Sequence, residues 1–500
     1  MAEIDYVSTE TARMFMDEAG DAERGVALWG DSVRVLHRGP QRTRVHVRSR
    51  SAERWIDNDA LGGRPLLELY FIDVGQGDGT LIVTPERKHV LIDGGWTRKY
   101  QPTGKNAADF VDWKFHSDYG LDEIHLDCMI ASHCDADHYG GLGDLLDRGS
   151  PRNAAELDTS STRVDAFFHA GVSWWRDLGG NGRWLGPESG GCLTRLLGDK
   201  SHLAHVLGGA DGFTPQGEWG DFLSLVSTHV PEVGRLSDIA NDAGCVPGFS
   251  PRDGAVTIRV LGPVEKTVGG APALTDFGRD DYNTNGHSLV LRLDYGDSRI
   301  LLTGDLNDKA HAELLERWGE NTSRFRCDVA KACHHGSDRI SYRFLQRMNA
   351  TATIVSSGDN ESHSHPRPSA LAAYAVTGHK TLADDGLAMR TPLLYCTEIA
   401  RSIALGKVSR LTMASHADFP LPAAGLAIDK DDGKAEIHYS GTASGPRSGF
   451  SGKRGLIGSR TQHRLIYGLV NVRTDGNRIL FAVRDEKHGG WEIETIDARF

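Results

Sequence analysis

Residues 131–141, ASHCDADHYGG, place two imidazoles and two carboxylates within six positions, namely His133, Asp135, Asp137 and His138. Burying ionised carboxylates together with imidazoles is costly unless a positive charge neutralises them, and a divalent cation does this. Three of these side chains alternate along an extended segment and His138 breaks the alternation. One short loop can therefore serve two metal ions. The alternative interpretation is a polar turn whose hydrogen bonds are satisfied internally.

The flanking segments predict how this cluster is held. LDCMIAS, just before it, has the apolar character of a buried strand, and YGGLGDLLDRG, just after it, predicts a short helix. The cluster then lies on a strand-to-helix loop, where several side chains can converge on one point. Further along, apolar segments such as AVTIRVLGPV, SRILLTGDL and TATIVSSGD alternate with helical stretches such as NDKAHAELLERWG. This alternation predicts an α/β layered domain.

SHCDADHYGG resembles the metal-binding motif of the metallo-β-lactamase-fold hydrolases, His-x-His-x-Asp-His, with Asp135 in place of the second His. This variant is similar to the metallohydrolase domain of the competence protein ComEC and its soluble relatives. Other motifs follow in the family's order over roughly residues 65–400. They are FIDVGQGDG with Asp73, LIDGG with Asp93, LLTGD with Asp305, HHGS with His334 and His335, and HSHPRP with His363 and His365.

The resemblance implies two divalent metal ions, zinc or manganese. One ion would be held by His133, Asp135 and a third ligand, to which we assign His287 of NGHSLVLRL, with a turn histidine as the alternative. The other would be held by Asp137, His138 and either His334 or His335, between which the sequence does not decide. Asp305 would lie between the two ions, and Asp93 would order the ligand loop.

The resemblance also implies the chemistry. Two metal ions can polarise a bridging water into hydroxide near neutral pH, and the hydroxide attacks phosphorus or a carbonyl carbon. Asp137 and His365 are the candidate catalytic residues, and His365 could equally be a ligand, a general acid or a phosphate contact. An aspartate at position 135 adds an oxygen ligand, which makes manganese or another hard metal plausible beside zinc.

The implied fold is a metallo-β-lactamase αββα sandwich with small β modules at both ends. We expect an N-terminal arm over residues 1–26, an SH3-like β module over 27–63 and the hydrolase domain over 64–400. The hydrolase domain would contain an insertion at about 150–255. A linker and a C-terminal β appendage would follow over 401–500. The linker assignment rests on the Gly/Ser-rich stretch YSGTASGPRSGFSGKRG.

Two features could contact a substrate. In RTRVHVRSR, Arg44 and Arg48 share one parity with neighbouring basic residues, so they form either a strip that contacts phosphates or an ordinary solvated face. In the insertion, Trp174 and Trp175 could stack on bases, or they could close a small hydrophobic core of their own. Both features are therefore tentative substrate-binding candidates.

Composition limits the function classes. The net charge of −12 argues against a general coat on nucleic acid or membrane, and no stretch approaches the length of a membrane-spanning helix. Seven scattered cysteines are poor material for a disulfide scaffold and indicate a reducing cytoplasm. The ComEC-like form of the motif and the arginine strip imply a phosphodiesterase, most simply a nuclease, and the composition adds that we expect it in the cytoplasm without a membrane partner. The alternatives are a small-molecule hydrolase acting on a lactone, thioester or phosphorylated metabolite, and an interaction protein with a regulatory or vestigial metal site.

Overall fold

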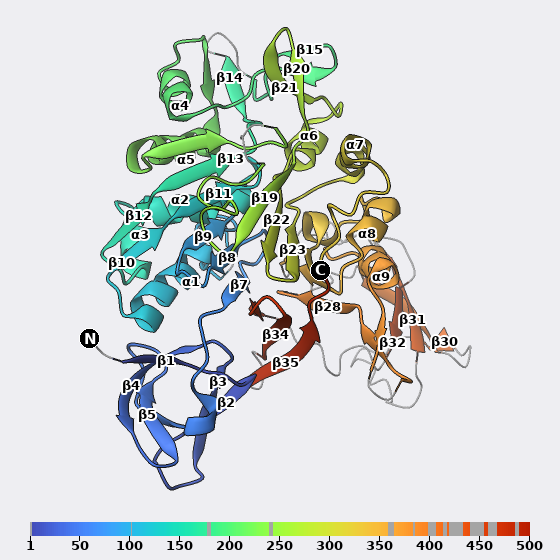
Figure 1. The fold of residues 1–500 in the computed structure, drawn as a ribbon. Helices are drawn as coiled ribbons and strands as arrows, with labels where there is room; N and C mark the ends of the chain where they lie inside the picture. The colour runs from blue at the N-terminus through green and yellow to red at the C-terminus, as the bar shows by residue number, and fades with distance from the viewer. Residues whose placement is uncertain are drawn as a thin grey trace.

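Two β-sheets lie face to face and helices cover both outer faces in the computed structural model of the chain (Figure 1). The structure describes residues 3–101, 103–177, 182–239, 244–358, 365–383, 386–398, 468–485 and 490–500, together with four strands between 407 and 458. These four layers, helix–sheet–sheet–helix, are the αββα sandwich predicted from the sequence. No helix in the described ranges combines the length and the apolar character needed to cross a bilayer.

The first sheet has nine strands in the order β18-β13-β11-β9-β8-β7-β33-β34-β35. Its strands β9, β11, β13 and β18 are parallel, so their carboxyl ends share one edge. Strands β8, β9, β11 and β13 are buried at every residue, as expected for strands covered on both faces. The nine strands are β7 (Leu67–Phe71), β8 (Thr80–Val83), β9 (His89–Ile92), β11 (Cys128–Ala131), β13 (Ala166–His169), β18 (Glu232–Arg235), β33 (Val470–Thr474), β34 (Arg478–Asp485) and β35 (Gly490–Asp497).

The second sheet has six strands in the order β19-β22-β23-β24-β25-β28. Strands β23, β24, β25 and β28 are parallel, so this sheet also gathers carboxyl ends at one edge. Apolar side chains of both sheets, such as Ile130 and Leu291, interdigitate to form one core. The six strands are β19 (Thr257–Gly262), β22 (Val290–Tyr295), β23 (Ser298–Leu302), β24 (Val329–Lys331), β25 (Ala352–Val355) and β28 (Leu393–Cys396).

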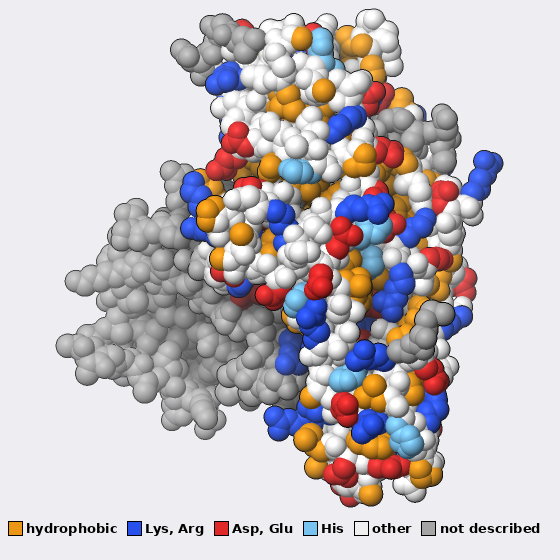
Figure 2. Space-filling model, turned by 90° about the vertical axis from the view of Figure 1, so that its left-hand side faces the viewer, with side chains coloured by type: hydrophobic (Ala, Val, Ile, Leu, Met, Phe, Trp, Pro, Cys, Tyr) orange, Lys and Arg blue, Asp and Glu red, His pale blue; other side chains and the backbone are white. Residues whose placement is uncertain are grey.

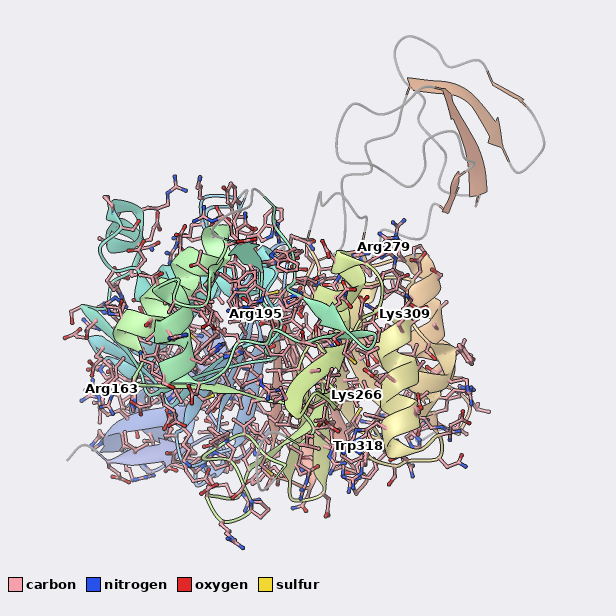
Figure 3. The ribbon with its side chains drawn as sticks, turned by 90° about the horizontal axis from the view of Figure 1, so that it is seen from above. Arg163, Arg195, Lys266, Arg279, Lys309 and Trp318 are labelled. Carbon is pink, nitrogen blue, oxygen red and sulfur yellow. The ribbon has the colours of Figure 1, made fainter. Side chains whose placement is uncertain are left out.

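Helices form the two outer layers. Against the first sheet pack α1 (Ala107–Trp113), the π-helical turn η2 (Lys114–Tyr119), α2 (Ala136–Leu146), α4 (Lys200–Leu207) and α5 (Gly217–His229), and the short helix α3 (Pro151–Glu156) follows α2 in the chain. Against the second lie α6 (Asp280–Gly286), α7 (Asp308–Trp318), the 3-10 turn η3 (Cys333–Gly336), α8 (Tyr342–Met348) and α9 (Pro368–Thr377). Figure 3 shows Lys309, at the start of α7, close to Arg279, which precedes α6. Both cations lie over the ring of Tyr282, which joins the two helices.

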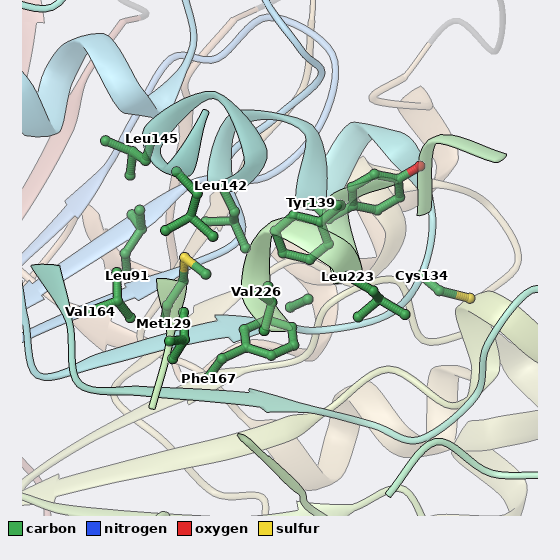
Figure 4. Close-up of a cluster of buried hydrophobic side chains, with 14 of the residues drawn as sticks. Leu91, Met129, Cys134, Tyr139, Leu142, Leu145, Val164, Phe167, Leu223 and Val226 are labelled. Atoms are coloured by element: carbon green, nitrogen blue, oxygen red, sulfur yellow. The ribbon is translucent and has the colours of Figure 1, made fainter. Parts of the chain in front are cut away.

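Helix α2 carries two of the candidate metal ligands, and its apolar side fixes its position. Figure 4 shows Tyr139 and Leu142 of this helix packed against Met129 of the sheet and Leu223 of α5. Tyr139 also stacks on Phe222, with ring centroids 5.3 Å apart. Because packing fixes the helix, its first turn has little freedom to shift, and the ligands there are held in place.

The N-terminal region differs from the expected arm and module. Residues 4–57 form a single six-stranded sheet of order β1-β4-β5-β6-β2-β3, so the segment expected as an arm contributes three of its strands. Val7 and Ala12 from that segment are buried beside Val33 and Val45, so the segment contributes two of the eight buried residues of the module's core. The elements are β1 (Ile4–Tyr6), β2 (Thr11–Phe15), β3 (Glu23–Leu28), β4 (Ser32–Arg38), β5 (Arg42–His46), β6 (Arg54–Asp57) and the 3-10 turn η1 (Asn58–Ala60).

The C-terminal region differs from the expected appendage. Strand β33 pairs antiparallel with β7, with Val470 opposite Phe71, so the last strands extend the first sheet. A separate four-stranded sheet precedes them, formed by β29 (Lys407–Met413), β30 (Asp418–Phe419), β31 (Lys434–Ser440) and β32 (Gly455–Gly458). Most of the expected linker lies outside the described residues. The sequence pattern identified strands at the C-terminus but not their partner, which is 400 positions earlier in the chain.

The insertion is also narrower than expected, because β13 and β18 belong to the first sheet and β12 pairs with β10 beside it. The additional small elements are β10 (Glu123–Leu126), β12 (Ser161–Val164), β14 (Trp175–Asp177), β15 (Glu188–Ser189), β16 (Cys192–Leu193), β17 (Phe213–Pro215), β20 (Glu265–Val268), β21 (Ala271–Thr275), β26 (Thr381–Leu382) and β27 (Met389–Thr391). Strand β16 of the insertion pairs with β21, which lies beyond the expected end of the insertion, about 80 residues later in the chain.

A buried ion pair fastens the C-terminal strands to the N-terminal module. Arg473 of β33 contacts Asp31 at 2.7 Å, and its guanidinium also donates to the carbonyl of Trp29 at 2.7 Å. We expect Arg473→Met to lower the free energy of unfolding by about 3 kcal/mol, because it removes the buried guanidinium that pairs with Asp31 and leaves this half-buried carboxylate only the amide of Leu28 as a hydrogen-bond partner among the described residues. Urea unfolding measures this change. The control is Arg13→Met, which removes an exposed ion pair with Glu23 and should cost less than about 1 kcal/mol. Equal losses in both variants would contradict the prediction.

Candidate metal centre

The carboxyl ends of four strands deliver the polar cluster. Asp93 follows β9, His133 follows β11 after one serine, Asp305 follows β23 and His335 follows β24. The strands are parallel within each pair, so all four side chains reach the edge where the two sheets meet. Ligand sites at the carboxyl ends of parallel strands are common in layered α/β folds.

Three histidines in this cluster share one arrangement. The Nδ1 atom of His138 lies 2.8 Å from Asp93, that of His335 lies 3.0 Å from the carbonyl of Ser356, and that of His133 lies 3.1 Å from the hydroxyl of Ser132. Each ring therefore has its Nδ1 engaged. Each Nε2 is buried and has no hydrogen-bond partner among the described residues. Imidazoles held at one nitrogen, with the other nitrogen left open in the interior, are the usual form of metal-ligating histidines.

The open Nε2 atoms face carboxylates. Asp305 Oδ2 lies 3.0 Å from His335 Nε2 and 3.3 Å from His138 Nε2. Asp137 Oδ2 lies 3.7 Å from His335 Nε2, and the Asp137 carboxylate also accepts a hydrogen bond from Gln76. Asp305 therefore lies between the open nitrogens of His335 and His138.

The ligand atoms of these residues form compact groups, with all atoms in each group within 4.8 Å of one another. The groups are His133 with His138 and Asp305, Asp137 with His138 and His335, Asp78 with Asp305 and His335, and Asp78 with Asp93 and His138. The second group contains the residues predicted for one ion, with His335 as the distal histidine. The first group contains only His133 of the set predicted for the other ion, and the two groups share His138. Open imidazole nitrogens beside buried carboxylates fit divalent cations, so the residues present suit the implied metals.

The electrostatics of the cluster support the same interpretation. Burial raises the pKa of Asp305, but the neighbouring His335 and His138 outweigh it and hold this pKa well below its usual range. Burial lowers the pKa of His335, whereas Asp305 and Asp78 raise it to about 10. Burial and then the charge of His138 lower the pKa of His133 to about 3, which keeps that ring neutral and able to act as a ligand. The site therefore attracts positive charge at its centre.

Asp93 contacts the loop that carries His133 and His138. Its backbone has a φ of 57°, and its carboxylate accepts hydrogen bonds from the Ser132 amide at 2.7 Å and the Ser132 hydroxyl at 2.6 Å. Nearby, a Cβ placed on Gly77 would lie 2.0 Å from the carbonyl of Asp137. The Gly-rich turn after β7 therefore packs directly on the ligand loop and needs glycine there. Asp73 begins this turn and accepts from the Gly75 amide at 3.2 Å.

Two predicted ligands have other partners. The ring of His287 stacks on Phe277 and its Nε2 lies 2.7 Å from the carbonyl of Thr275, so this histidine belongs to the packing of α6 and lies outside the four ligand groups. This corrects its assignment as third ligand in favour of the turn histidine. Asp135 lies 3.7 Å from His133 Nε2, but its two oxygens accept from Thr284 and Trp174. It adjoins the cluster without joining a ligand group.

The choice between the two adjacent histidines follows from the turn that carries them. His334 and His335 have φ values of 47° and 53°, so the backbone turns sharply and the two rings lie at 75° to each other. His335 reaches the centre, whereas His334 Nε2 stays 3.9 Å from Asp305 and outside the four groups. His365 lies behind them, with its ring 5.4 Å from that of His334, and its role stays a prediction.

Sequence reasoning missed two buried residues of the centre, Asp78 and Lys331. The Lys331 amine contacts Asp78 and lies 3.4 Å from Asp305 Oδ1, and it donates to the carbonyl of Gly304 at 2.8 Å. Burial lowers the pKa of Lys331, but the two carboxylates outweigh this and raise it. Lysine within the apolar strand DVAKAC and aspartate within the turn GQGDG were the available signals, since neither belongs in a dry interior without a partner.

The tryptophans of the insertion do not present faces to a base. Trp175 is fully buried and Trp174 nearly so, and both belong to the core of the first helical layer. This corrects their assignment as stacking residues in favour of the core alternative. The exposed Arg183, however, lies with its guanidinium 3.6 Å from the Trp174 ring, and the indole of that residue reaches Asp135 at 3.4 Å. The insertion therefore brings an exposed positive charge next to the cluster.

Comparisons with known proteins agree with the fold. Residues 72–162 match the model of the metallo-beta-lactamase superfamily. The chain is 31% identical over 313 residues to ComE operon protein 3 of Bacillus subtilis, which is 61% of this chain and 30% of that protein. It is 32% identical over 108 residues to Competence protein ComA of Neisseria gonorrhoeae, which is 21% of this chain and 15% of that protein. It thus spans less than a third of either relative.

Among solved structures, the chain is similar to one described as a new diphosphatase from the PhnP family. The sequence identity is 13% and the TM-score is 0.25, over 58% of this chain and 85% of that one. The family match and the layer order together confirm the predicted fold class.

The two adjacent histidines give a direct test of the centre. We expect His335→Asn to weaken metal binding by about 100-fold or more. Loss of a group that hydrogen-bonds to a ligand lowers metal affinity by up to about 100-fold, and loss of the ligand itself should lower it at least as much. His334→Asn is the matched control and should bind nearly as tightly as the unaltered chain. Asparagine tolerates the positive φ that both positions require. Competition with a chelator measures the affinities, and an equal loss in both variants would contradict the assignment.

The support from Asp93 can be tested separately. We expect Asp93→Asn to lower metal affinity by about 10- to 100-fold, because the amide cannot accept from both Ser132 and His138 as the carboxylate does. Asp165→Asn is the control, since Asp165 holds His125 at 2.8 Å in a similar pair outside the centre. An unchanged affinity in Asp93→Asn would show that the orientation of His138 does not depend on this contact.

Proposed function

We propose that this chain, a ComEC-like protein whose residues 72–162 place it in the metallo-β-lactamase superfamily, uses its metal-dependent hydrolase domain as a phosphodiesterase, and that its substrate is nucleic acid. The observation that carries this proposal is the share of oxygen ligands in the centre. Asp78, Asp137 and Asp305 accompany three histidines there. Oxygen ligands favour hard cations such as manganese, which are the usual partners of phosphate esters.

Two divalent cations in such a centre would polarise the phosphoryl group and activate water. The residues of the chain provide the geometry for this chemistry. Asp93 and Ser132 hold the rings of His138 and His133 by their Nδ1 atoms, so that the open nitrogens face Asp305. Lys331 offsets part of the negative charge of the carboxylates from one side. The side chains thus form a rigid frame whose positions are set before substrate binds.

An exposed cation at the rim supports an anionic substrate. Arg183 is held against the Trp174 ring, and Trp174 contacts Asp135 next to the ligand His133. A guanidinium in this position suits a phosphate oxygen, to which it can donate two hydrogen bonds. A neutral lactone or thioester has no comparable use for it. Small-molecule hydrolysis therefore remains the second outcome of the substrate test.

The catalytic test compares substrates and metals. We expect bis-p-nitrophenyl phosphate and single-stranded DNA to be cleaved with manganese, and a panel of lactones to be left intact. Asp137→Ala should lower the rate by at least about 100-fold, because it removes a carboxylate of the ligand group. Asp147→Ala, at the other end of the same helix, is the matched control and should keep full activity. Lactone hydrolysis without phosphodiester cleavage would overturn the proposal.

The rim arginine gives a second test. We expect Arg183→Gln to raise KM for a phosphodiester by about tenfold with a smaller change in kcat, since it removes one charge-assisted contact away from the reacting atoms. Arg176→Gln is the control, because Arg176 is also exposed on the insertion but has no contact with Trp174 among the described residues. Steady-state kinetics on both variants measures the split. An equal KM in the two variants would remove Arg183 from the substrate path.

A further inference from the structure

A groove of about 660 Å³ lies where three distant parts of the chain meet. One wall comes from the N-terminal module, the second from Phe110 and Trp113 of α1, and the third from the C-terminal hairpin with Trp491 and Ile493. The volume is in the range of sites that hold small ligands or a few nucleotides. None of the groove residues belongs to the metal centre.

Positive charge gathers around this groove. Four arginines line it, Arg24, Arg48, Arg54 and Arg484, and none of them has an ion-pair partner within the part of the chain that the structure describes. The acidic residue lining it, Asp31, is engaged by the buried Arg473. Elsewhere on the face seen in Figure 2, Lys and Arg side chains are interspersed with Asp and Glu. On a chain of net charge −12, an unpaired set of this kind indicates an anionic ligand.

The arginines of the strip predicted from the sequence fall into two groups, those paired with a carboxylate and those that line the groove. Arg42, Arg44 and Arg50 are neutralised by Asp57, Glu53 and Asp122, at 2.7, 3.6 and 2.8 Å. Arg48 differs, because its guanidinium lies 4.7 Å from the centre of the Trp113 ring and points into the groove lining. The shared parity of the strip therefore does not make it a continuous phosphate surface.

Aromatic rings stand beside the charges. Trp113 and Trp491 are each only partly buried, and Arg484 lies 5.5 Å from the ring of Trp491 as Arg48 does near Trp113. Each side of the groove thus combines a ring face with a guanidinium. Stacking on bases together with contacts to phosphates is how proteins hold single-stranded nucleic acid without reading its sequence. An acidic peptide would use the arginines but would have no need of paired indole faces.

We propose that this groove binds single-stranded nucleic acid, with Arg48 and Arg484 contacting phosphates and Trp113 and Trp491 stacking on bases. The site is distinct from the metal centre and does not rest on the proposed phosphodiesterase activity. Both terminal regions would take part in this binding, because the groove forms where the N-terminal module and the last hairpin meet α1.

The experiment measures binding without cleavage. A fluorescent oligothymidylate of about 15 nucleotides is titrated with the full chain carrying Asp137→Ala, in chelator, at several salt concentrations. We expect Arg48→Gln with Arg484→Gln to weaken binding at least about tenfold. It should also lower the slope of log affinity against log salt by about 1.4, because each phosphate contact on a single strand contributes about 0.7. Trp491→Leu should weaken binding by about tenfold through lost stacking.

The matched control removes two arginines of the same module outside the groove. Arg13→Gln with Arg38→Gln makes the same change in net charge, and both residues are ion-paired, with Glu23 and Glu3. This double variant should bind as the unaltered chain does, and thermal melting checks that all variants fold. Equal losses in the two double variants would overturn the proposal. Tighter binding of polyglutamate than of the oligonucleotide, or no effect of Trp491→Leu, would overturn it as well. Binding that persists in Asp137→Ala distinguishes this site from the activity of the metal centre.

Discussion

The orientation of three buried imidazoles is the constraint on which the rest of the centre depends. Each of His133, His138 and His335 has its Nδ1 held by a fixed group and its Nε2 left open beside Asp305. An imidazole nitrogen without a partner in a dry interior is unfavourable, and so is a cluster of carboxylates. The two costs are relieved together by a cation. The arrangement of these histidines and carboxylates is therefore stable only when positive charge is present among them. Protons, Lys331 or metal ions can carry this charge.

The layered fold provides this frame at low local cost. Parallel strands in each sheet end at one edge, so short loops after β9, β11, β23 and β24 bring their polar side chains together without long excursions. Among the described residues, three of the five non-glycine residues with positive φ lie in these loops, at Asp93 and at the two adjacent histidines. Strain of this kind persists only where the surroundings fix it. The packing of α2 on the first sheet, through Tyr139 and Leu142, supplies that restraint.

The order of the motifs along the sequence was sufficient to predict the fold class and most of the centre, because each motif directly follows a strand with a strong apolar pattern. What the motif order did not determine was the direction in which each side chain points. His287 and His335 are both histidines next to strand ends, yet one stacks on Phe277 and the other reaches Asp305. Asp78 and Lys331 were missed because their partners come from different sheets. Contacts between distant segments depend on packing, which leaves no local pattern to read.

The terminal regions illustrate the same limit on a larger scale. Period-two patterns predicted strands at both ends, but pairing β33 with β7 requires knowledge of the whole sheet. Strand parity likewise grouped the basic residues of β5 and of the segment after it, whereas carboxylates from neighbouring strands and distant segments decide which of them are ion-paired. Arg44 is neutralised by Glu53 while Arg48 has a ring beneath it. Most arginines of this strip are paired with carboxylates, and Arg48 joins the other arginines that line the groove between the terminal regions. The net charge alone argues against a nucleic-acid ligand. The positive groove is therefore a property of the tertiary structure and cannot be read from the composition.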